Sequence, residues 1–313
     1  MDFVPPNKLV KIKPDTLEYV RKLYNLDKPG SMKEAVNILN EWVQKQPHFN
    51  KKDFITATRC LEVAIVLSKG SVERAKTQLD KMCTMRTLYP EFFGIFNPKT
   101  DCPGLFDMCH TVILPKLTKD HYRVYVTKFL NSEDYLQPLY YKYHITVAEY
   151  LKSHDYFCGV VMIVDVSISN FLSYIKKTDI IMMKKAINIS IDGYGIRIKA
   201  IHVISDSKFL DNALAIVKPM LSAKIASRIH VHNSYEELHK IIPKEILPKD
   251  YGGEERSIKT LQEEWIEELS SEEHLSYLKV MNGATTNESC RQKSQFAEQY
   301  AGMPGTFRFL SVE

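Results

Sequence analysis

The chain has 313 residues, of which 44% are apolar and 26% are charged, and its mean hydropathy is −0.24. These values are typical of a globular protein and exclude the disordered and fibrous classes. The net charge of +4 is too small for a dense nucleic-acid-binding surface, so no nucleic-acid partner is expected. The N-terminus lacks the apolar run of a signal peptide, and no stretch is apolar enough to span a bilayer. We expect a cytoplasmic protein that is peripheral at membranes.

A helical N-terminal domain is predicted for residues 1–92. Apolar residues recur at helical spacing in three runs, at about 33–46, 53–67 and 71–88. Ser71 is the expected N-cap of the third helix, because its hydroxyl can accept from an unpaired backbone N–H of the first turn.

Strands alternating with helices follow, in a domain expected to span residues 93–255. Strands are expected at 122–129, 159–166 and 196–204, and helices at 136–151 and 180–191. The strand GVVMIVDV is apolar almost throughout, as is typical of a strand buried on both faces. This alternation predicts an α/β sheet with crossover helices. Residues 256–313 are expected to form an amphipathic helix, from Arg256 to Met281, and a tail.

Motifs for catalysis and metal binding are missing from the sequence. It contains no P-loop, dinucleotide-binding fingerprint, nucleophile elbow or HExxH motif. Cys102, Cys109 and His110 lack the spacing of zinc ligands, and His230 and His232 have no third ligand nearby. We therefore expect no enzyme, no cofactor and no metal; a hydrolase or isomerase acting on a bound lipid is the weakest of the alternatives.

An apolar helix is expected over residues 207–228. Its apolar stripe consists of Phe209, Leu210, Ala213, Leu214, Val217 and Leu221. Pro219 removes a backbone donor and crowds the preceding turn, so the helix should bend or loosen there. Such a helix could open over an apolar interior, but a kinked core helix that never moves fits the same residues.

Basic residues accompany this helix. Arg197 and Lys199 share one face of a strand, and Lys224 and Arg228 share one side of the helix that also carries Lys218. An anionic membrane attracts such a cluster by about 1 kcal/mol per basic residue near the lipid. Ordinary solvated charges give the same pattern.

The region from Gly193 to Gly253 resembles the signature region of the CRAL-TRIO (Sec14-like) lipid-binding family. The branch it resembles is the animal one that includes the α-tocopherol transfer and cellular retinaldehyde-binding proteins. The likeness rests on a strand with I-H-x-I, the run K-P-x-L-x-x-K-I-x-x-R-I-H-x-H and the ending L-H-x-x-I-P-x-x-I-L-P-x-x-Y-G-G. GVVMIVDV matches the family's G-x-x-x-I-x-D strand, and the C-terminal GTFRFLSVE is similar to the ending of insect members. The likeness covers essentially the whole chain and is weakest in the N-terminal domain.

The resemblance implies an all-α N-terminal bundle, an α/β domain whose mixed sheet forms the floor of an apolar cavity, and a helical gate. It implies ligand contacts from the gate, the floor and the preceding helix: Leu139, Tyr143, Thr146, Val160, Val164, Ile189, Tyr194, Ile196, Ile201, Leu210, Ala213, Leu214, Val217 and Leu221.

The resemblance also implies a basic patch, which takes phosphoinositide head groups in some members of the family. Together with the basic residues of the apolar helix, the expected membrane or phosphoinositide patch is Lys69, Arg197, Lys199, Lys218, Lys224 and Arg228. The family's R-x-R-K in the N-terminal domain is VLSK here, at 66–69, which leaves only the lysine. Because a multivalent phosphate needs several charged donors at once, head-group binding should be weaker.

The expected function is binding of a small hydrophobic ligand and its transfer between membranes, the ligand being a retinoid, tocopherol, carotenoid or similar isoprenoid. Burial of such a molecule is favourable by roughly 25 cal/mol per Å² of apolar area. Hydroxyls such as those of Tyr143, Thr146 or Tyr194 would add specificity. The alternative is an adaptor whose cavity is filled by bulky residues such as Met162, and whose basic surface binds a protein or an anionic membrane.

Overall fold

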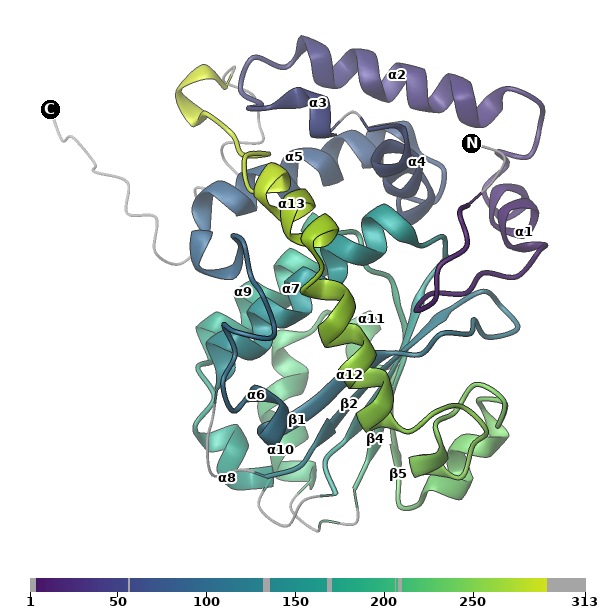
Figure 1. The fold of residues 1–313 in the computed structure, drawn as a ribbon, viewed down its shortest axis with the longest axis vertical. Coiled ribbons are helices and arrows are strands. Elements are labelled where there is room, and N and C mark those ends of the chain that lie inside the picture. Colours follow the sequence, from purple (N-terminus) through teal and green to yellow (C-terminus); the bar gives the residue numbers. More distant parts are fainter. Residues whose placement is uncertain are drawn as a thin grey trace, which may run out of the picture.

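The computed structural model of the protein describes residues 4–55, 57–131, 136–167, 171–205, 207 and 210–291. Figure 1 shows a layer of helices at one end of a sheet, and further helices that pack along the sheet. Phe209 of the expected apolar helix and the C-terminal GTFRFLSVE lie outside the described residues.

The N-terminal layer is helical, as predicted. Its helices are α1 (Thr16–Leu23), α2 (Ser31–Lys45), α3 (Lys52–Ile55), α4 (Thr58–Leu67) and α5 (Val72–Leu88), followed by the 3-10 turn η1 (Pro90–Phe92). Ser71 is the N-cap of α5, as expected, because its hydroxyl accepts from the backbone N–H of Arg74 at 3.3 Å.

The sheet is mixed and has five strands in the order of the sequence. They are β1 (Cys109–Ile113), β2 (Arg123–Phe129), β3 (Val160–Asp165), β4 (Ile198–Ile204) and β5 (Ile229–His232). β1 and β2 are antiparallel, whereas the three later pairings are parallel and need crossover connections. The predicted α/β fold class is therefore confirmed.

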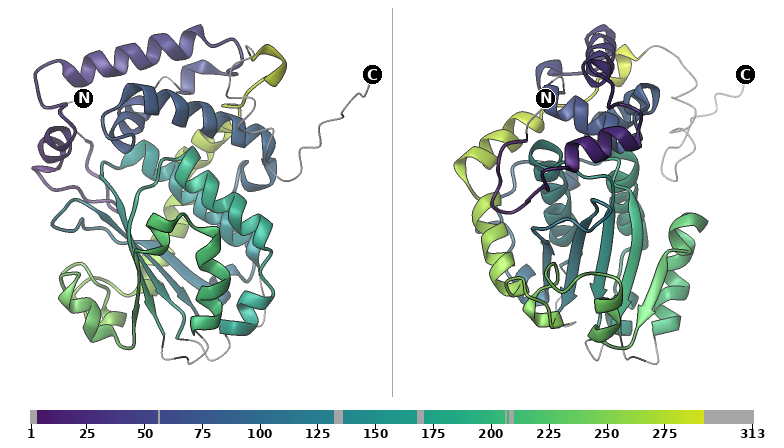
Figure 2. Two further views of the ribbon diagram at one scale, coloured as in Figure 1. Left: turned by 180° about the vertical axis from the view of Figure 1, so that it is seen from behind. Right: turned by 90° about the vertical axis from the view of Figure 1, so that its right-hand side faces the viewer.

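The crossovers between the parallel strands are mostly helical. The short α6 (Leu105–Met108) precedes β1, and α7 (Gln137–His154) connects β2 to β3. The later crossovers comprise α8 (Phe171–Lys176), α9 (Ile180–Asn188), the π-helical turn η2 (Ile189–Gly193), α10 (Leu210–Val217), the 3-10 turn η3 (Lys218–Met220) and α11 (Ala223–Ala226). Figure 2 shows α10 and α9 on the face of the sheet that is turned away from the viewer in Figure 1.

The opposite face is covered by the C-terminal part of the chain, shown at the front in Figure 1. It contains the 3-10 turns η4 (Tyr235–Lys240) and η5 (Lys249–Tyr251), then α12 (Ile258–Leu269), α13 (Glu272–Met281) and the turn η6 (Glu288–Cys290). Trp265 of α12 donates its indole N–H to the carbonyl of Ile113 in β1 at 3.0 Å. The prediction of a single helix from Arg256 to Met281 is wrong, because the chain forms two helices there. The Ser271 hydroxyl accepts from the backbone N–H of His274 and is the N-cap of α13.

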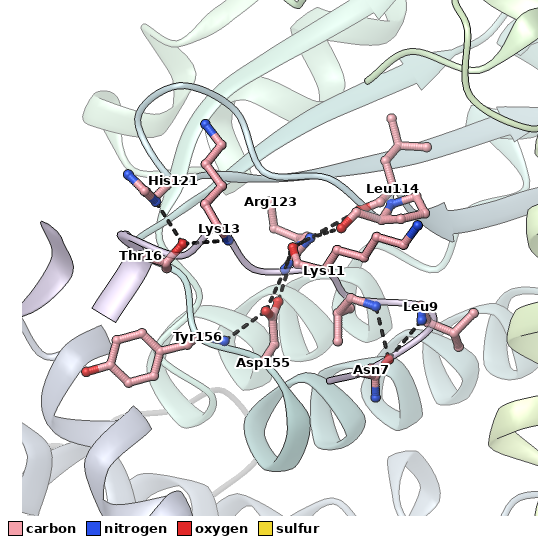
Figure 3. Close-up of polar contacts among 12 residues, drawn as sticks. Asn7, Leu9, Lys11, Lys13, Thr16, Leu114, His121, Arg123, Asp155 and Tyr156 are labelled. Carbon is pink, nitrogen blue, oxygen red and sulfur yellow. Dashed lines mark hydrogen bonds and ion pairs between the residues drawn. The ribbon is translucent and has the colours of Figure 1, made fainter. Parts of the chain in front are cut away.

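A strap formed by residues 4–13 ties the N-terminus to the α/β domain. Leu9 and Val10 are fully buried in the core of that domain. The Asn7 side-chain oxygen accepts from the backbone N–H groups of both residues, at 2.8 and 3.0 Å, and its amide nitrogen donates to the Tyr150 hydroxyl at 2.7 Å. The bonds to the backbone stabilise a bend at residues 8–10 (Figure 3), and the bond to Tyr150 attaches the strap to α7.

Arg123, at the start of β2, is the buried clamp beneath this strap (Figure 3). Its Nε and Nη2 donate to the two carboxylate oxygens of Asp155 at 2.8 and 2.6 Å. Its Nη1 donates to the carbonyl of Pro115 at 2.5 Å, and both Nη1 and Nη2 lie within hydrogen-bonding distance of the Lys11 carbonyl. One guanidinium therefore joins the strap, the β1–β2 connection and the end of α7.

The helical layer and the α/β domain share a buried cluster around α5, α7 and η2. The Gln78 side chain of α5 donates to the carbonyl of Gly193 at 3.2 Å. Gly195 has φ +71°, and a Cβ there would lie 2.8 Å from the Gln78 amide nitrogen, so this close approach requires glycine. Arg86 of α5 and Glu149 of α7 form a buried ion pair beside it.

Candidate ligand-binding cavity

An apolar cavity of about 320 Å³ lies between the sheet and the helices α7 to α10. Nine of the fourteen predicted ligand contacts are in its lining: Val160, Val164, Ile196, Ile201, Leu210, Ala213, Leu214, Val217 and Leu221. These nine residues therefore lie around one cavity, and their contact with a ligand stays a prediction.

The floor consists of residues that the pleat of the strands turns to one side. Val160, Met162 and Val164 alternate along β3 and all face the cavity. In β4, Ile198 and Ile201 both face it although they are three residues apart. The pairing with β3 shifts there, so Lys199 is the extra residue of a β-bulge. Because of this extra residue, the side chains of Ile198 and Ile201 face the same side of the sheet.

The covering helix is α10, and its inward stripe has helical spacing. Leu210, Ala213, Leu214 and Val217 line the cavity, whereas Ile216 on the outer side is 37% exposed. The helix ends at Val217, and Pro219 lies in the turn η3 that follows. The predicted loosening at the proline is confirmed, but the expected single helix over 207–228 is not, because α11 forms separately.

Five predicted contacts lie outside the cavity lining: Leu139, Tyr143, Thr146, Ile189 and Tyr194. The Tyr143 hydroxyl accepts from Gln262 of α12 at 2.8 Å, and the Tyr194 hydroxyl bonds to Glu149 in the cluster shared with α5. The Thr146 hydroxyl donates to the Lys142 carbonyl at 3.0 Å. Ile189 is buried in the same cluster as Tyr194, and Leu139 packs against the α/β core.

The cavity-facing side of α7 differs from the expected one. The residues that line the cavity are Tyr140, Tyr141, His144, Ile145, Val147, Ala148 and Leu151. Because α7 packs on several sides, most of its residues are buried and its pattern does not reveal which stripe faces the ligand. The spacing of 140, 144, 147 and 151 was the only signal for the correct face.

A polar pair lies within this apolar lining. The hydroxyl of Tyr125 in β2 is hydrogen-bonded to Nδ1 of His144 in α7, and the Tyr140 ring meets the imidazole edge to face at 4.1 Å. Burial lowers the pKa of His144 to about 3 and raises the pKa of Tyr125 well above its usual value. Both groups are therefore neutral at physiological pH.

Five of the six predicted basic residues form one cluster at the surface, in which their charges contribute to the lowered pKa values of Lys69 and Lys199. They are Lys69, Arg197, Lys199, Lys224 and Arg228. The positive charges of Arg197 and then Lys224 lower the pKa of Lys69. Desolvation is the largest cause of the lowered pKa of Lys199, followed by the charge of Arg197. We call these five residues the basic surface; the sixth predicted residue, Lys218, is exposed in η3 beside the covering helix.

Aromatic rings hold two residues of the basic surface in place. The Arg197 guanidinium lies 5.3 Å from the centre of the Tyr24 ring and donates to its hydroxyl. The Lys199 ammonium lies 4.6 Å from the centre of the Tyr122 ring. Arg197 is thus positioned against Tyr24 at the end of α1 and Lys199 against Tyr122 just before β2, while Lys69 and Lys224 are exposed.

Stability should fall in acid because three histidines are buried in the neutral form. Burial lowers the pKa of His144 to about 3 and the pKa values of His202 and His274 to about 4. The unfolded chain binds these protons near pH 6.5, so the free energy of unfolding should decrease as pH falls from 6.5 to 4. The slope is up to about 1.4 kcal/mol per pH unit for each histidine. Urea denaturation at pH 7.5 and 5.0 measures this, and equal stabilities would contradict it.

The chain thus combines an N-terminal helical bundle with an α/β domain in which a mixed sheet floors an apolar cavity. Residues 107–253 match the family model of the CRAL/TRIO domain. Over these residues the chain is therefore similar to the CRAL/TRIO domain family.

Curated relatives match shorter segments. The alpha-tocopherol transfer protein-like protein of Homo sapiens is 48% identical over 71 residues, which are 22% of this chain and 21% of that protein. Clavesin-2 of Rattus norvegicus is 32% identical over 96 residues, 30% of this chain and 29% of the relative. The matches span less than a third of these relatives. The solved structure of Sfh5 has a TM-score of 0.45 and 14% identity, over 81% of this chain and 93% of that one.

The described ranges contain neither a membrane-spanning helix nor a metal-binding group of side chains. Among these residues no helix is both long and apolar enough to cross a membrane. No group of three or more His, Cys, Asp or Glu side chains in the same residues could hold a metal ion.

Proposed function

We propose that the protein binds one small hydrophobic lipid in the cavity and transfers it between membranes, without acting on it as an enzyme. The proposed ligand class is the retinoids, tocopherols, carotenoids and similar isoprenoids. The observation that carries this proposal is the apolar cavity of about 320 Å³, which lies at the lower end of the range of small-molecule sites. The similarity to a protein named alpha-tocopherol transfer protein-like supports the ligand class.

The composition of the lining supports a carrier. The lining consists mostly of aliphatic and aromatic side chains. Transfer of a hydrocarbon from water to such surroundings is favourable by roughly 25 cal/mol per Å² of apolar area buried. Ser190 in the lining donates its hydroxyl to the carbonyl of Ala186 at 2.9 Å, and His144 is bonded to Tyr125. A serine and a histidine that are engaged elsewhere do not form the nucleophile and base that a lipid hydrolase requires.

The adaptor alternative required a filled interior. Met162 and Met183 were large enough to fill it, but both belong to the lining of an open volume. Methionine is flexible and suits a pocket that adapts to its ligand. The geometry therefore favours the carrier over the adaptor.

Titration of the purified chain with retinol and with α-tocopherol, in the absence of membranes, tests the proposal. Tryptophan quenching should show saturable binding of at least one of them with one site per chain. If neither lipid saturates the protein, while circular dichroism shows that it is folded, the cavity does not serve this ligand class.

We further propose that the basic surface docks the protein on anionic membranes while the neighbouring covering helix α10 opens. Lys224 lies in α11, which follows α10 and η3 along the chain, so one docking event brings the gate close to the lipid. Phosphoinositides should increase binding only modestly, because Val66 and Ser68 stand where the family has arginines.

Reversal of two exposed charges should weaken this docking. The double variant Lys69→Glu/Lys224→Glu should bind vesicles of 30% phosphatidylserine at least about 10-fold more weakly, since each basic residue near the lipid contributes about 1 kcal/mol. Lipid affinity in solution should not change. The control Lys33→Glu/Lys259→Glu, on α2 and α12, changes the net charge equally. If control and test variants lose vesicle binding to the same degree in co-sedimentation, the basic surface is not the docking site.

A further inference from the structure

The polar side chains in the cavity lining differ in how their hydrogen bonds are satisfied. They are Tyr125, Tyr140, Tyr141, His144, Tyr174, Thr178 and Ser190. The hydroxyls of Ser190 and Thr178 donate to carbonyls of their own helical turns, at 2.9 and 3.2 Å. By contrast, Nε2 of His144 is buried and has no hydrogen-bond partner among the described residues.

The contact with Tyr125 determines which nitrogen of His144 carries the proton. A phenol donates more readily than it accepts, so the Tyr125 hydroxyl donates to Nδ1 of His144. A neutral imidazole whose Nδ1 accepts carries its proton on Nε2. The lowered pKa of His144 keeps the ring neutral at physiological pH. His144, which lines the cavity, therefore carries a neutral N–H donor for which the described residues supply no acceptor, and burial without an acceptor is unfavourable.

We propose that Nε2 of His144 donates a hydrogen bond to a neutral oxygen of the bound lipid, and that Tyr125 holds the imidazole in the tautomer that can donate. This inference rests on the proposed carrier function and specifies its ligand as a lipid alcohol, aldehyde or ketone. A carboxylic acid fits poorly, since the described residues of the lining include no Lys or Arg to neutralise it. A pure hydrocarbon leaves the donor unpaired.

The sheet order gives the orientation of the ligand. Tyr125 pairs with Ile113 of the edge strand β1 and with Met162 of β3, so the polar pair lies toward the β1 edge of the floor. Ile229 of β5 lines the cavity at the opposite edge. A lipid whose oxygen accepts from His144 of α7 thus extends its hydrocarbon part across the floor toward β5.

Retinoids with different end groups on one skeleton test this assignment. The full chain and the variant His144→Leu are titrated with retinol, retinal, retinoic acid and the corresponding hydrocarbon. Wild type should bind the alcohol and the aldehyde about 10-fold more tightly than the acid and the hydrocarbon. The variant should lose about 10-fold for the alcohol and aldehyde, and less than about 2-fold for the hydrocarbon.

Ser190→Ala is the matched control, because Ser190 lines the same cavity and its hydroxyl is satisfied by Ala186; its selectivity should equal that of wild type. Tyr125→Phe should show an intermediate loss, since it frees the tautomer but keeps the imidazole. If His144→Leu keeps the wild-type order of affinities, the inference is wrong and the carrier proposal stands. If wild type binds neither the four retinoids nor α-tocopherol, both are overturned.

A spectroscopic measurement makes the test independent of how the variants fold. Nitrogen-15 NMR of histidine-labelled wild type should show His144 as the neutral tautomer protonated at Nε2 at pH 7, and its Nε2 resonance should shift when retinal is added. A proton on Nδ1, or an unchanged Nε2 resonance in the saturated protein, would overturn the assignment.

Discussion

Replacing Arg123 by methionine is expected to lower the free energy of unfolding by about 3 to 5 kcal/mol. The guanidinium is fully buried and donates to both oxygens of the Asp155 carboxylate. Its loss would leave the buried Asp155 carboxylate without its charged partner and would remove one donor from the carbonyls of Pro115 and Lys11 (Figure 3). The strap should detach from the sheet, because this guanidinium donates to the Lys11 carbonyl within the strap.

Urea denaturation followed by circular dichroism measures this effect. The matched control is Lys8→Met, whose ion pair with Glu268 at 3.0 Å involves a lysine side chain that is 65% exposed, and it should cost at most about 1 kcal/mol. The double variant Arg123→Met/Asp155→Leu should recover part of the loss, since no buried charge then remains. A loss below about 1 kcal/mol for Arg123→Met would show that the clamp is not needed for stability.

Substitution of Val164 by tryptophan is expected to weaken lipid binding at least about 100-fold. Val164 pairs with Thr127 of β2 and Val203 of β4, so its side chain rises from the middle of the cavity floor. An indole there would occupy the volume that the lipid needs, whereas overpacking would cost roughly 1 to 3 kcal/mol of stability.

The control for this substitution is Ile216→Trp, which adds the same ring to the exposed side of α10. Its affinity for retinol or α-tocopherol should equal that of wild type. If Val164→Trp binds either lipid as wild type does, the lipid occupies another part of the molecule.

Local patterns predicted those parts of the cavity in which one stripe of an element is apolar. GVVMIVDV is a buried strand by composition, and Leu210, Ala213, Leu214 and Val217 are one helical stripe, so both were located without coordinates. The resemblance to the CRAL-TRIO family supplied the relation between them, which spacing alone did not.

Features made by tertiary contact were not predictable in this way. On α7 most positions are buried, so the stripe with Tyr140 and His144 did not stand out from the one with Tyr143 and Thr146. The bulge at Lys199 depends on pairing with β3 and leaves no mark in the sequence.

Buried polar pairs were missed for the same reason. Tyr125 and His144 are 19 residues apart, and Arg123 and Asp155 are 32 residues apart. A buried arginine and a surface arginine look alike in a sequence. The members of each pair meet only in the folded chain. The pair of Arg123 and Asp155 is expected to contribute to stability, and the pair of Tyr125 and His144 is proposed to select the lipid.

Mass spectrometry of the lipid that co-purifies with the protein from its native source tests the central claim most directly. One predominant isoprenoid that carries a neutral alcohol or carbonyl oxygen is expected, near one molecule per folded chain, and it should be lost from the Val164→Trp variant. Folded protein that yields no lipid above the solvent background, or the same lipid in equal amount from Val164→Trp, would contradict a carrier that uses this cavity.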